Sequence, residues 1–329
     1  MLTSSFPQVP LATVLIPVYN AEAYLLEALR SISAQTFADF EILVVDDGST
    51  DRSPELLAEY ARADPRLRVL RQANGGISAA LNRGLEDARG EFIVRMDADD
   101  VMLPPRIQTQ VAFLQAHPRL GFCASAMEMI DSKGRVFDRY SPRPRTEAEL
   151  DQMMTDRLPI VYTHPTVTYR TAAVRALGGY DREQEPCEDM DLFGRLILAG
   201  HRGVVLPEIL MRYRVHGHSI SGSKIAQQVA AQEFVRAVFY ARRDGRILGR
   251  AEYESQARAA SWPERLRARA RLRCTVMQRT SLYRRAAGQP WKARAWMALA
   301  AMYRPWPALR AASRLLLRPD RSSVSARRA

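Results

Sequence analysis

Cysteine is scarce in this sequence, which has only Cys123, Cys187 and Cys274 among its 329 residues. The three lie far apart and lack the Cys-x-x-Cys spacing of zinc and redox motifs. A disulfide framework is therefore not expected, and the sparse cysteine content fits a reducing compartment.

Long apolar runs are also missing. No stretch approaches the roughly 20 uninterrupted apolar residues that a membrane-spanning helix needs. No basic segment precedes the first apolar run, and Pro17 interrupts that run, so we expect no signal peptide. The expected location is the cytoplasm, with the protein either free or held on the inner face of the cell membrane.

Acidic residues are few in the last third of the chain. Residues 1–223 contain 24 Lys and Arg against 30 Asp and Glu, a net charge of −6, whereas residues 224–329 contain 24 against 6, a net charge of +18. The two values give the formal net charge of +12. This asymmetry predicts a domain over residues 1–223 and a basic helical extension over residues 224–329 that ends in a disordered tail.

The first hundred residues alternate between short apolar runs rich in β-branched residues and segments with helical spacing. The apolar runs predict buried strands at 12–18, 40–45, 67–71 and 91–96. Such alternation predicts an α/β fold with a mostly parallel sheet flanked by helices. Further along, residues 131–150 read as a polar loop or lid, and residues 161–170 as another strand.

Polar side chains follow three of these predicted strands. They are Tyr19 with Asn20, Asp46 with Asp47, and Asp97 with Asp99. Parallel strands of an open α/β sheet carry their ligand sites at their carboxyl ends. The three clusters are therefore expected to share one edge of the sheet.

The acidic cluster after the fourth strand has two interpretations. Asp97 and Asp99 can present two carboxylates to one Mg²⁺ or Mn²⁺ beside a substrate diphosphate. They can equally be solvated acids before a helix that begins near Pro104–Pro105. Asp100 is expected to lead into that helix.

The other candidates also keep two interpretations. Asp46 and Asp47 are either turn residues or ligands of a base or ribose. Glu188 and Asp189 either favour a helix N-terminus or supply a general base. His216 is either structural or part of a metal shell.

The order of these motifs resembles the family-two inverting glycosyltransferases. The resemblance rests on VLIPVYNAEAYLLEALRSISAQTFADFEILVVDDGSTDRSPELL, NGGISAALNRGLEDARGEFIVRMDADD and CEDMDLFGRLILAG, and it covers about residues 10–220. It implies the GT-A fold, which is a Rossmann-like sheet, and a nucleotide-sugar donor. Related processive synthases carry a QxxRW motif and several spanning helices; neither is found here, so a single transfer is expected.

The resemblance also implies roles for individual residues. Asp189 matches the catalytic base, with Glu188 as its neighbour or the lesser candidate. Asp97 and Asp99 match the metal motif, His216 a histidine near metal and diphosphate, and His164 a segment that faces the acceptor. The residues that match the nucleotide-sugar site are Pro17, Tyr19, Glu22, Asp46, Asp47, Asn74, Gly75, Asn82 and Asp97.

The expected activity is transfer of a sugar, with UDP as the commonest donor nucleotide among relatives, to a hydroxyl of a lipid-linked or cell-surface glycan. The alternative is a catalytically silent nucleotide-sugar-binding protein at the membrane surface. The basic extension either packs on the catalytic domain or anchors it to anionic lipid through Trp291, Trp296, Trp306 and the leucines at 315–317. Nucleic acid is not an expected partner, because no motif that reads it is present.

Overall fold

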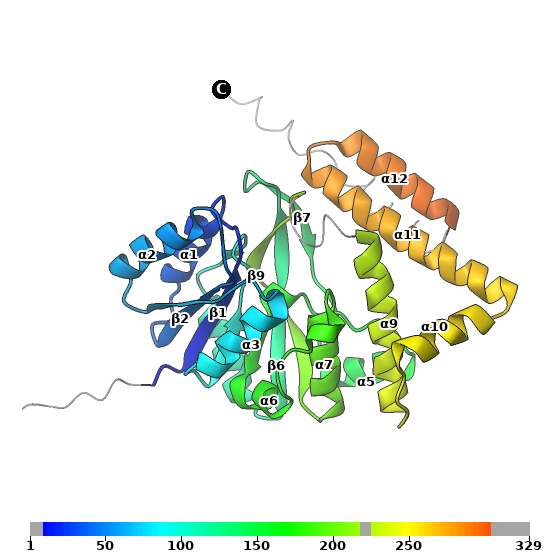
Figure 1. Cartoon of the computed structure of the whole chain (residues 1–329), viewed down its shortest axis with the longest axis horizontal. Helices are drawn as coiled ribbons and strands as arrows, with labels where there is room; N and C mark the ends of the chain where they lie inside the picture. The colour runs from blue at the N-terminus through cyan, green and yellow to red at the C-terminus, as the bar shows by residue number, and fades with distance from the viewer. Residues whose placement is uncertain (1–8, 218–224, 304–329) are drawn as a thin grey trace, which may run out of the picture. The chain divides into compact units, whose positions relative to one another are not determined.

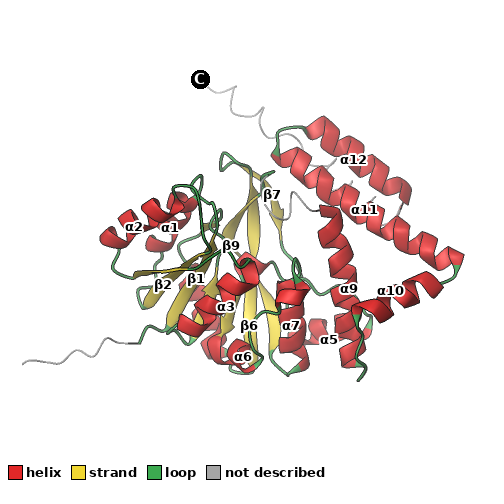
Figure 2. Cartoon of the chain, viewed as in Figure 1, coloured by secondary structure: helices red, strands yellow, loops and turns green. Residues whose placement is uncertain are grey.

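The computed structural model describes residues 9–217 and 225–303. The first of its two compact units has a central sheet with helices on either side (Figure 1; Figure 2). The strands are β1 (Ala12–Val18), β2 (Phe40–Asp46), β3 (Leu67–Arg71), β4 (Phe92–Arg95), β5 (Val101–Met102), β6 (Leu120–Ile130), β7 (Val136–Tyr140), β8 (Thr168–Arg170) and β9 (Arg202–Arg214). The helices are α1 (Leu25–Ser33), α2 (Ser53–Ala63), α3 (Ile77–Asp87), α4 (Arg106–Ala116), α5 (Glu147–Thr155), α6 (Thr171–Ala176), α7 (Glu188–Leu198), α9 (Ile225–Arg243), α10 (Arg250–Ala259), α11 (Trp262–Ala286) and α12 (Pro290–Tyr303), with short 3₁₀ helices η1 (His164–Thr166) and η2 (Arg182–Gln184).

The chain divides into two compact units. The first comprises residues 1–214 and 234–248, and the second residues 215–233 and 249–329, each as far as it is described. These units differ from the expected ranges of 1–223 and 224–329. The difference arises because the second half of α9 belongs with the first unit, where Val235 and Phe239 lie against α7.

The sheet has the strand order β3-β2-β1-β4-β8-β6-β9-β5, with β7 paired to β6. The first four strands are parallel, as the alternation predicts. Beyond β4 the pairing is mixed, because β8 runs antiparallel to both β4 and β6 while β9 is parallel to β6. The predicted α/β class with a central sheet between helices is confirmed.

Both faces of the sheet are covered, which explains why its strands read as continuous apolar runs. Every residue of β2 is buried. Leu15 of β1 belongs to the cluster of buried side chains that includes Leu81 of α3, so its neighbours Val14 and Ile16 point to the opposite face. The contact of α3 is close, since a Cβ on Gly84 would lie 2.1 Å from Leu15 Cδ1.

Two local predictions are wrong. Residues 131–150, expected as a loop, contain β7 and α5. The β7 strand forms a hairpin with β6, and α5 begins where the Thr146 hydroxyl accepts a hydrogen bond from the Glu149 N–H. Residues 161–170, expected as a strand, form one only from Thr168, because Pro165 lies in the 3₁₀ turn η1.

In the second unit, α11 and α12 pack against each other through short side chains. Their buried residues include Cys274 and Ser281 of α11 and Ala293 of α12, and the Ser281 hydroxyl donates to the Ala293 carbonyl at 2.7 Å. The predicted basic helix over 262–285 is therefore present. Trp306, the leucines at 315–317 and the predicted tail lie outside the described residues. Among the helices of residues 9–217 and 225–303, none is long and apolar enough to cross a membrane.

Candidate active site

The loops that follow β1 and β2 hold each other in place. Asn20 has a φ of +50°, a left-handed conformation that asparagine tolerates better than most residues. Its backbone N–H donates to the Ser49 hydroxyl, and its side-chain oxygen accepts from the Thr50 N–H at 2.8 Å. Glu22 adds a second connection between the loops, since its carboxylate accepts a hydrogen bond from the Arg52 N–H. The two predicted ligand segments therefore form one rigid rim.

Asp46 and Asp47 have different surroundings at the end of β2. Asp46 is fully buried and accepts from the Ser49 N–H at 3.0 Å, with the Arg71 guanidinium 3.0 Å from its other oxygen. Asp47 accepts from the backbone N–H groups of Gly75 and Gly76, both at 2.9 Å. Asp47 thus shapes the glycine loop before α3, and its contact with a nucleotide stays a prediction.

The remaining predicted nucleotide contacts are spread over this rim. Tyr19 is 53% exposed, Asn74 is exposed, and Pro17 is half-buried at the end of β1. Asn82 pairs with the backbone of Tyr180, donating to its carbonyl and accepting from its N–H. The contact of Tyr19 with a nucleotide-sugar stays a prediction, whereas Asn82 joins α3 to the segment that precedes α7.

Three carboxylates gather after β4. Asp97, Asp99 and Asp100 each offer an oxygen, and these oxygens lie within 4.8 Å of one another. Asp97 and Asp99 are partly open, but Asp100 is buried and accepts from the Arg214 N–H at 2.8 Å. Within the described structure, the second oxygen of Asp100 is buried without a hydrogen-bond partner. An all-oxygen set of this kind fits Mg²⁺ or Mn²⁺.

Arg95 contacts this cluster through Asp97. It ends β4 with only 1% of its surface exposed, and its Nη1 lies 2.7 Å from Asp97 Oδ1. This is an ion pair by distance, although neither Nη1 nor Nε of Arg95 makes an aligned hydrogen bond to a described residue. Sequence reasoning missed Arg95. The available signal was a single cation in an otherwise apolar strand, immediately before three acids.

Arg214 connects the acidic loop to the end of β9. Its Nε donates to the Asp99 carbonyl at 2.7 Å, and its Nη2 lies 2.6 Å from a carboxylate oxygen of Glu27. The guanidinium also lies over the Tyr24 ring. His216 follows two residues later in the second unit, so its role toward a metal stays a prediction.

Two acids begin α7, as the sequence predicts. Glu188 is buried, and Asp189 is partly open. Burial raises the pKa of Glu188 to about 8, with a further contribution from the Asp189 charge. Burial also raises the pKa of Asp189 to about 6, against the Met190 N–H and the Arg95 charge, which lower it. At neutral pH Asp189 is therefore mostly ionised and Glu188 mostly protonated.

The acids of α7 and the cluster after β4 influence each other electrostatically. The Asp97 charge raises the pKa of Asp189, and the Arg95 charge opposes the effect of burial on Asp97 as well as on both α7 acids. The charge of one buried cation thus acts on residues about ninety positions apart in the sequence. This joins the predicted base to the predicted metal site.

His164 lies behind this centre. It is buried, and its Nε2 is 2.8 Å from the hydroxyl of Tyr180, which in turn lies 3.1 Å from the hydroxyl of Tyr169. Burial and the Arg95 charge hold the pKa of His164 well below its ordinary value, so the ring is neutral. His164 therefore belongs to a buried polar network, and its predicted contact with an acceptor remains untested.

Sequence relatives cover about three fifths of the chain. The chain is 32% identical over 209 residues to a protein of Bacillus subtilis named as the glycosyltransferase EpsE, covering 62% of this chain and 73% of that protein. It is 31% identical over 205 residues to the amylovoran biosynthesis glycosyltransferase AmsE of Erwinia amylovora, covering 61% and 75%.

Solved structures share the fold. TarS residues 1–349 of S. aureus, in complex with UDP-GlcNAc, align with a TM-score of 0.56 at 20% identity over 92% of this chain and 88% of that one. The mannosyltransferase PcManGT of Pyrobaculum calidifontis, in complex with GDP-Man and Mn²⁺, aligns with a TM-score of 0.55 at 17% identity over 93% and 85%. The predicted GT-A fold is thereby confirmed.

The family assignment rests on the segment that holds the rim after β1 and β2 and the acidic cluster after β4. Residues 13–178 match the family described as Glycosyl transferase family 2. Those residues run from β1 through α6, and the relatives named above are glycosyltransferases of polysaccharide pathways or carry that activity in their names. The chain belongs to glycosyl transferase family 2.

Proposed function

We propose that this glycosyltransferase transfers one sugar at a time, with inversion, from a nucleotide-sugar to a hydroxyl of a glycan acceptor. Asp189 removes the proton from the attacking hydroxyl, because it is ionised at neutral pH and partly open at the first turn of α7. The hydroxyl attacks the anomeric carbon from the face opposite the departing nucleotide. That direction of attack inverts the configuration of the sugar.

The observation that carries this proposal is the common electrostatic centre of the α7 acids and the acidic cluster. A base for the acceptor and an anion-rich site for the leaving group must lie on either side of one sugar carbon. The Asp97 charge raises the pKa of Asp189, and the Arg95 charge lowers the pKa of both acids. This arrangement supports displacement at a single centre.

Asp97 and Asp99 are the proposed ligands of a Mg²⁺ or Mn²⁺ ion. They are the two partly open carboxylates of the cluster, while Asp100 is held by the Arg214 N–H. When bound, such an ion neutralises the charge of the departing diphosphate. Arg95 fixes Asp97 by its 2.7 Å ion pair, and its charge opposes the rise in the pKa of Asp97 that burial causes.

UDP is the proposed donor nucleotide. TarS has been crystallised with UDP-GlcNAc and the mannosyltransferase with GDP-Man, so these neighbours support a nucleotide-sugar and leave its base to be measured. The proposed nucleotide contacts are Tyr19, Asp46 and Asp47 on the rim after β1 and β2. The proposed acceptor is a lipid-linked or cell-surface glycan, in keeping with the polysaccharide pathway named for AmsE.

A panel of nucleotide-sugars tested by thermal shift with Mn²⁺ identifies the donor. We expect one donor to raise the melting temperature in a concentration-dependent way, because a ligand that binds only the folded state stabilises it by mass action. Asp99→Asn should lose the Mn²⁺-dependent part of that shift, whereas Asp39→Asn at an exposed site should keep it. A Mn²⁺ effect equal in all three proteins would contradict the ligand assignment.

A catalytically silent nucleotide-sugar-binding protein is the competing function. It predicts the same thermal shifts but no release of nucleoside diphosphate. Release of nucleoside diphosphate in the presence of Mn²⁺, lost in Asp189→Asn, separates the two.

We also propose that the second unit docks on an anionic membrane surface. Trp291, Leu299 and Met302 are 68%, 43% and 79% exposed, and with Ala295 and Ala298 they form one outward face of α12. Residues 249–303 contain twelve basic and three acidic residues, and α12 itself has no acid. An apolar helix face within a basic surface is complementary to lipid with negative headgroups. Trp296, named in the sequence interpretation, is half-buried instead.

Vesicle binding tests this docking surface. We expect the full chain to sediment with phosphatidylcholine vesicles that contain phosphatidylglycerol, and weakly with phosphatidylcholine alone. Replacing Trp291, Leu299 and Met302 with Ser should weaken binding at least about tenfold, since each buried apolar side chain contributes roughly 1.5–3 kcal/mol. Val136→Ser with Tyr140→Ser, at the exposed strand β7, is the matched control. Equal binding of both variants would rule out α12, and a stable dimer lost in the triple variant would assign the face to a second copy.

A further inference from the structure

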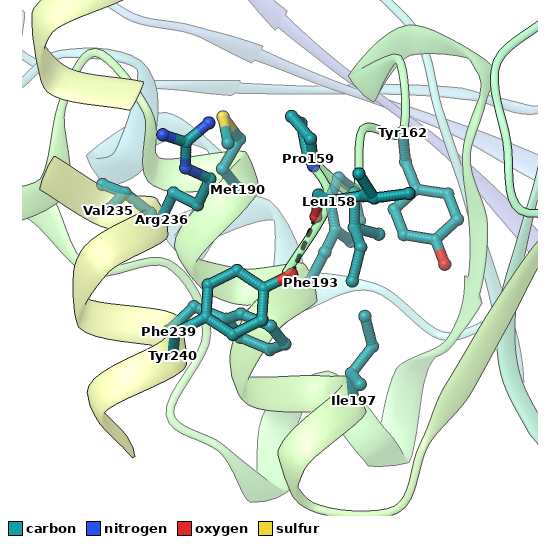
Figure 3. Close-up of a pocket in the computed structure, with 12 residues that line it drawn as sticks. Leu158, Pro159, Tyr162, Met190, Phe193, Ile197, Val235, Arg236, Phe239 and Tyr240 are labelled. Carbon is teal, nitrogen blue, oxygen red and sulfur yellow. Dashed lines mark hydrogen bonds between the residues drawn. The ribbon is translucent and has the colours of Figure 1, made fainter. Parts of the chain in front are cut away.

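An apolar pocket lies beside the first three turns of α7, within the first unit (Figure 3). Its empty space, counting the part that is open to solvent, is about 460 Å³. Met190, Phe193 and Ile197 line it from one face of α7, and Val235 and Phe239 from α9. Met190 directly follows Asp189, the proposed base, in the first turn of α7.

The walls of the pocket present hydrocarbon because their hydroxyl groups are used elsewhere. Tyr240 donates its hydroxyl to the Leu158 carbonyl, and Tyr162 donates to the Gly203 carbonyl, both at 2.7 Å. Gly194 allows α7 and α9 to approach, since a Cβ there would lie 3.0 Å from Phe239 Cδ2. These contacts hold the lining side chains in place, so the pocket is a defined feature of the first unit.

The pocket has a charged end and an apolar end. Among its twelve lining residues only Arg236 is charged. Figure 3 shows Arg236 beside Met190 at one end and Ile197 at the other. Met190 and Ile197 are seven residues apart on α7, which corresponds to roughly 10 Å at the helical rise of 1.5 Å per residue. The cation is therefore at the end nearest Asp189.

We propose that this pocket binds the apolar chain of an amphiphilic acceptor with an anionic headgroup. The chain lies along α7 toward Ile197, and the negative headgroup lies at Arg236, which leaves the sugar hydroxyl at Asp189. The inference rests on the proposed function and specifies its acceptor class: a glycan carried on a lipid phosphate. A wholly polar polysaccharide would leave the hydrocarbon surface of the pocket without a partner.

Calorimetric titration with linear alkyl phosphates below their micelle concentrations tests the pocket without donor or metal. We expect affinity to rise about fourfold with each added methylene until the pocket is full, because each buried methylene contributes a constant increment. Val235→Phe, which fills the pocket, should remove this dependence on chain length. The same substitution at exposed Val136 on β7 should leave it intact. Ile160→Phe repeats the test from the opposite wall should Val235→Phe fail to fold.

Neutral alkyl glucosides separate the chain from the headgroup. Arg236→Gln should weaken the binding of alkyl phosphates severalfold and leave the binding of alkyl glucosides unchanged. Affinity independent of chain length, or equal effects of the Val235 and Val136 variants, would overturn the proposal and mark the pocket as an incompletely filled contact between two helices. Donor-induced thermal shifts of the same variants report the proposed function separately, since that binding does not involve this pocket.

Discussion

Asp189→Asn should lower the rate of sugar transfer by about 10²–10⁴-fold, the usual effect of removing a general base. The amide has nearly the same shape as the carboxylate but cannot accept the proton of the acceptor hydroxyl. Donor binding should remain nearly unchanged, because the proposed nucleotide contacts lie on the rim after β1 and β2. Initial rates with saturating donor, together with donor-induced thermal shifts, measure the two effects.

Glu188→Gln is the discriminating control for this assignment. Because burial raises the pKa of Glu188 to about 8, that side chain is largely protonated at neutral pH and is a poor base there. Its replacement should therefore lower the rate much less than Asp189→Asn does. A larger loss in Glu188→Gln would transfer the role of base to Glu188.

The pH profile gives an independent test of the same base. Asp189 must be ionised to act, and burial raises its pKa to about 6. The transfer rate should therefore rise as the pH increases through about 6, well above the ordinary aspartate value of roughly 3.9. This acid limb should disappear from the residual activity of Asp189→Asn.

Arg95→Met should destabilise the protein by about 3–5 kcal/mol, the usual cost of leaving one member of a buried ion pair without its partner. The destabilisation should lie near the lower end of this range, since 30% of the Asp97 side chain is exposed. Without Arg95, the carboxylates of Asp97 and Asp100 lose a nearby positive charge in a buried setting. Urea denaturation followed by circular dichroism measures the change.

The loss should depend on pH in a defined direction. Burial already raises the pKa of Asp97 and Asp100, and removing Arg95 raises both further. The folded variant then binds protons more readily than the unfolded chain, so its stability relative to the parent should improve from about pH 7 to about pH 5. Arg83→Met, which breaks the exposed Arg83–Asp87 pair, should change stability by less than about 0.5 kcal/mol at either pH. A deficit of Arg95→Met that does not change with pH would refute the electrostatic explanation.

The parallel half of the sheet could be predicted because its signals are local. The strands β1 to β4 are short apolar runs, each separated by a helix with its own periodicity, and burial on both faces leaves no polar alternation. The strands beyond β4 were harder to predict from the sequence. A 3₁₀ turn at Pro165 shortened a predicted strand, and β7 became visible only through its pairing with β6.

The acidic residues of the candidate site could be predicted from the sequence, but the residues that contact them in the folded protein could not. Asp97, Asp99 and Asp189 stand at sequence positions where a strand ends or a helix begins, and such positions carry ligands in this class of fold. The ionisation of Asp189 could not be predicted, because it depends on burial and on Arg95, which is 94 positions away. The pairing of Asn82 with Tyr180 likewise joins residues 98 positions apart.

The sequence by itself determined the α/β class, the family, the order of the acidic motifs and the separation of charge between the two parts of the chain. The fold class and the separation of charge depend on periodicity and on residue type, which neighbouring residues express, whereas the family rests on the resemblance of the motifs and their order. Only the tertiary structure shows how burial raises the pKa values of Glu188 and Asp189, which cation pairs with Asp97 and where α7 and α9 line an apolar pocket. Those properties arise from burial and from through-space charge, which act between side chains that only folding brings together.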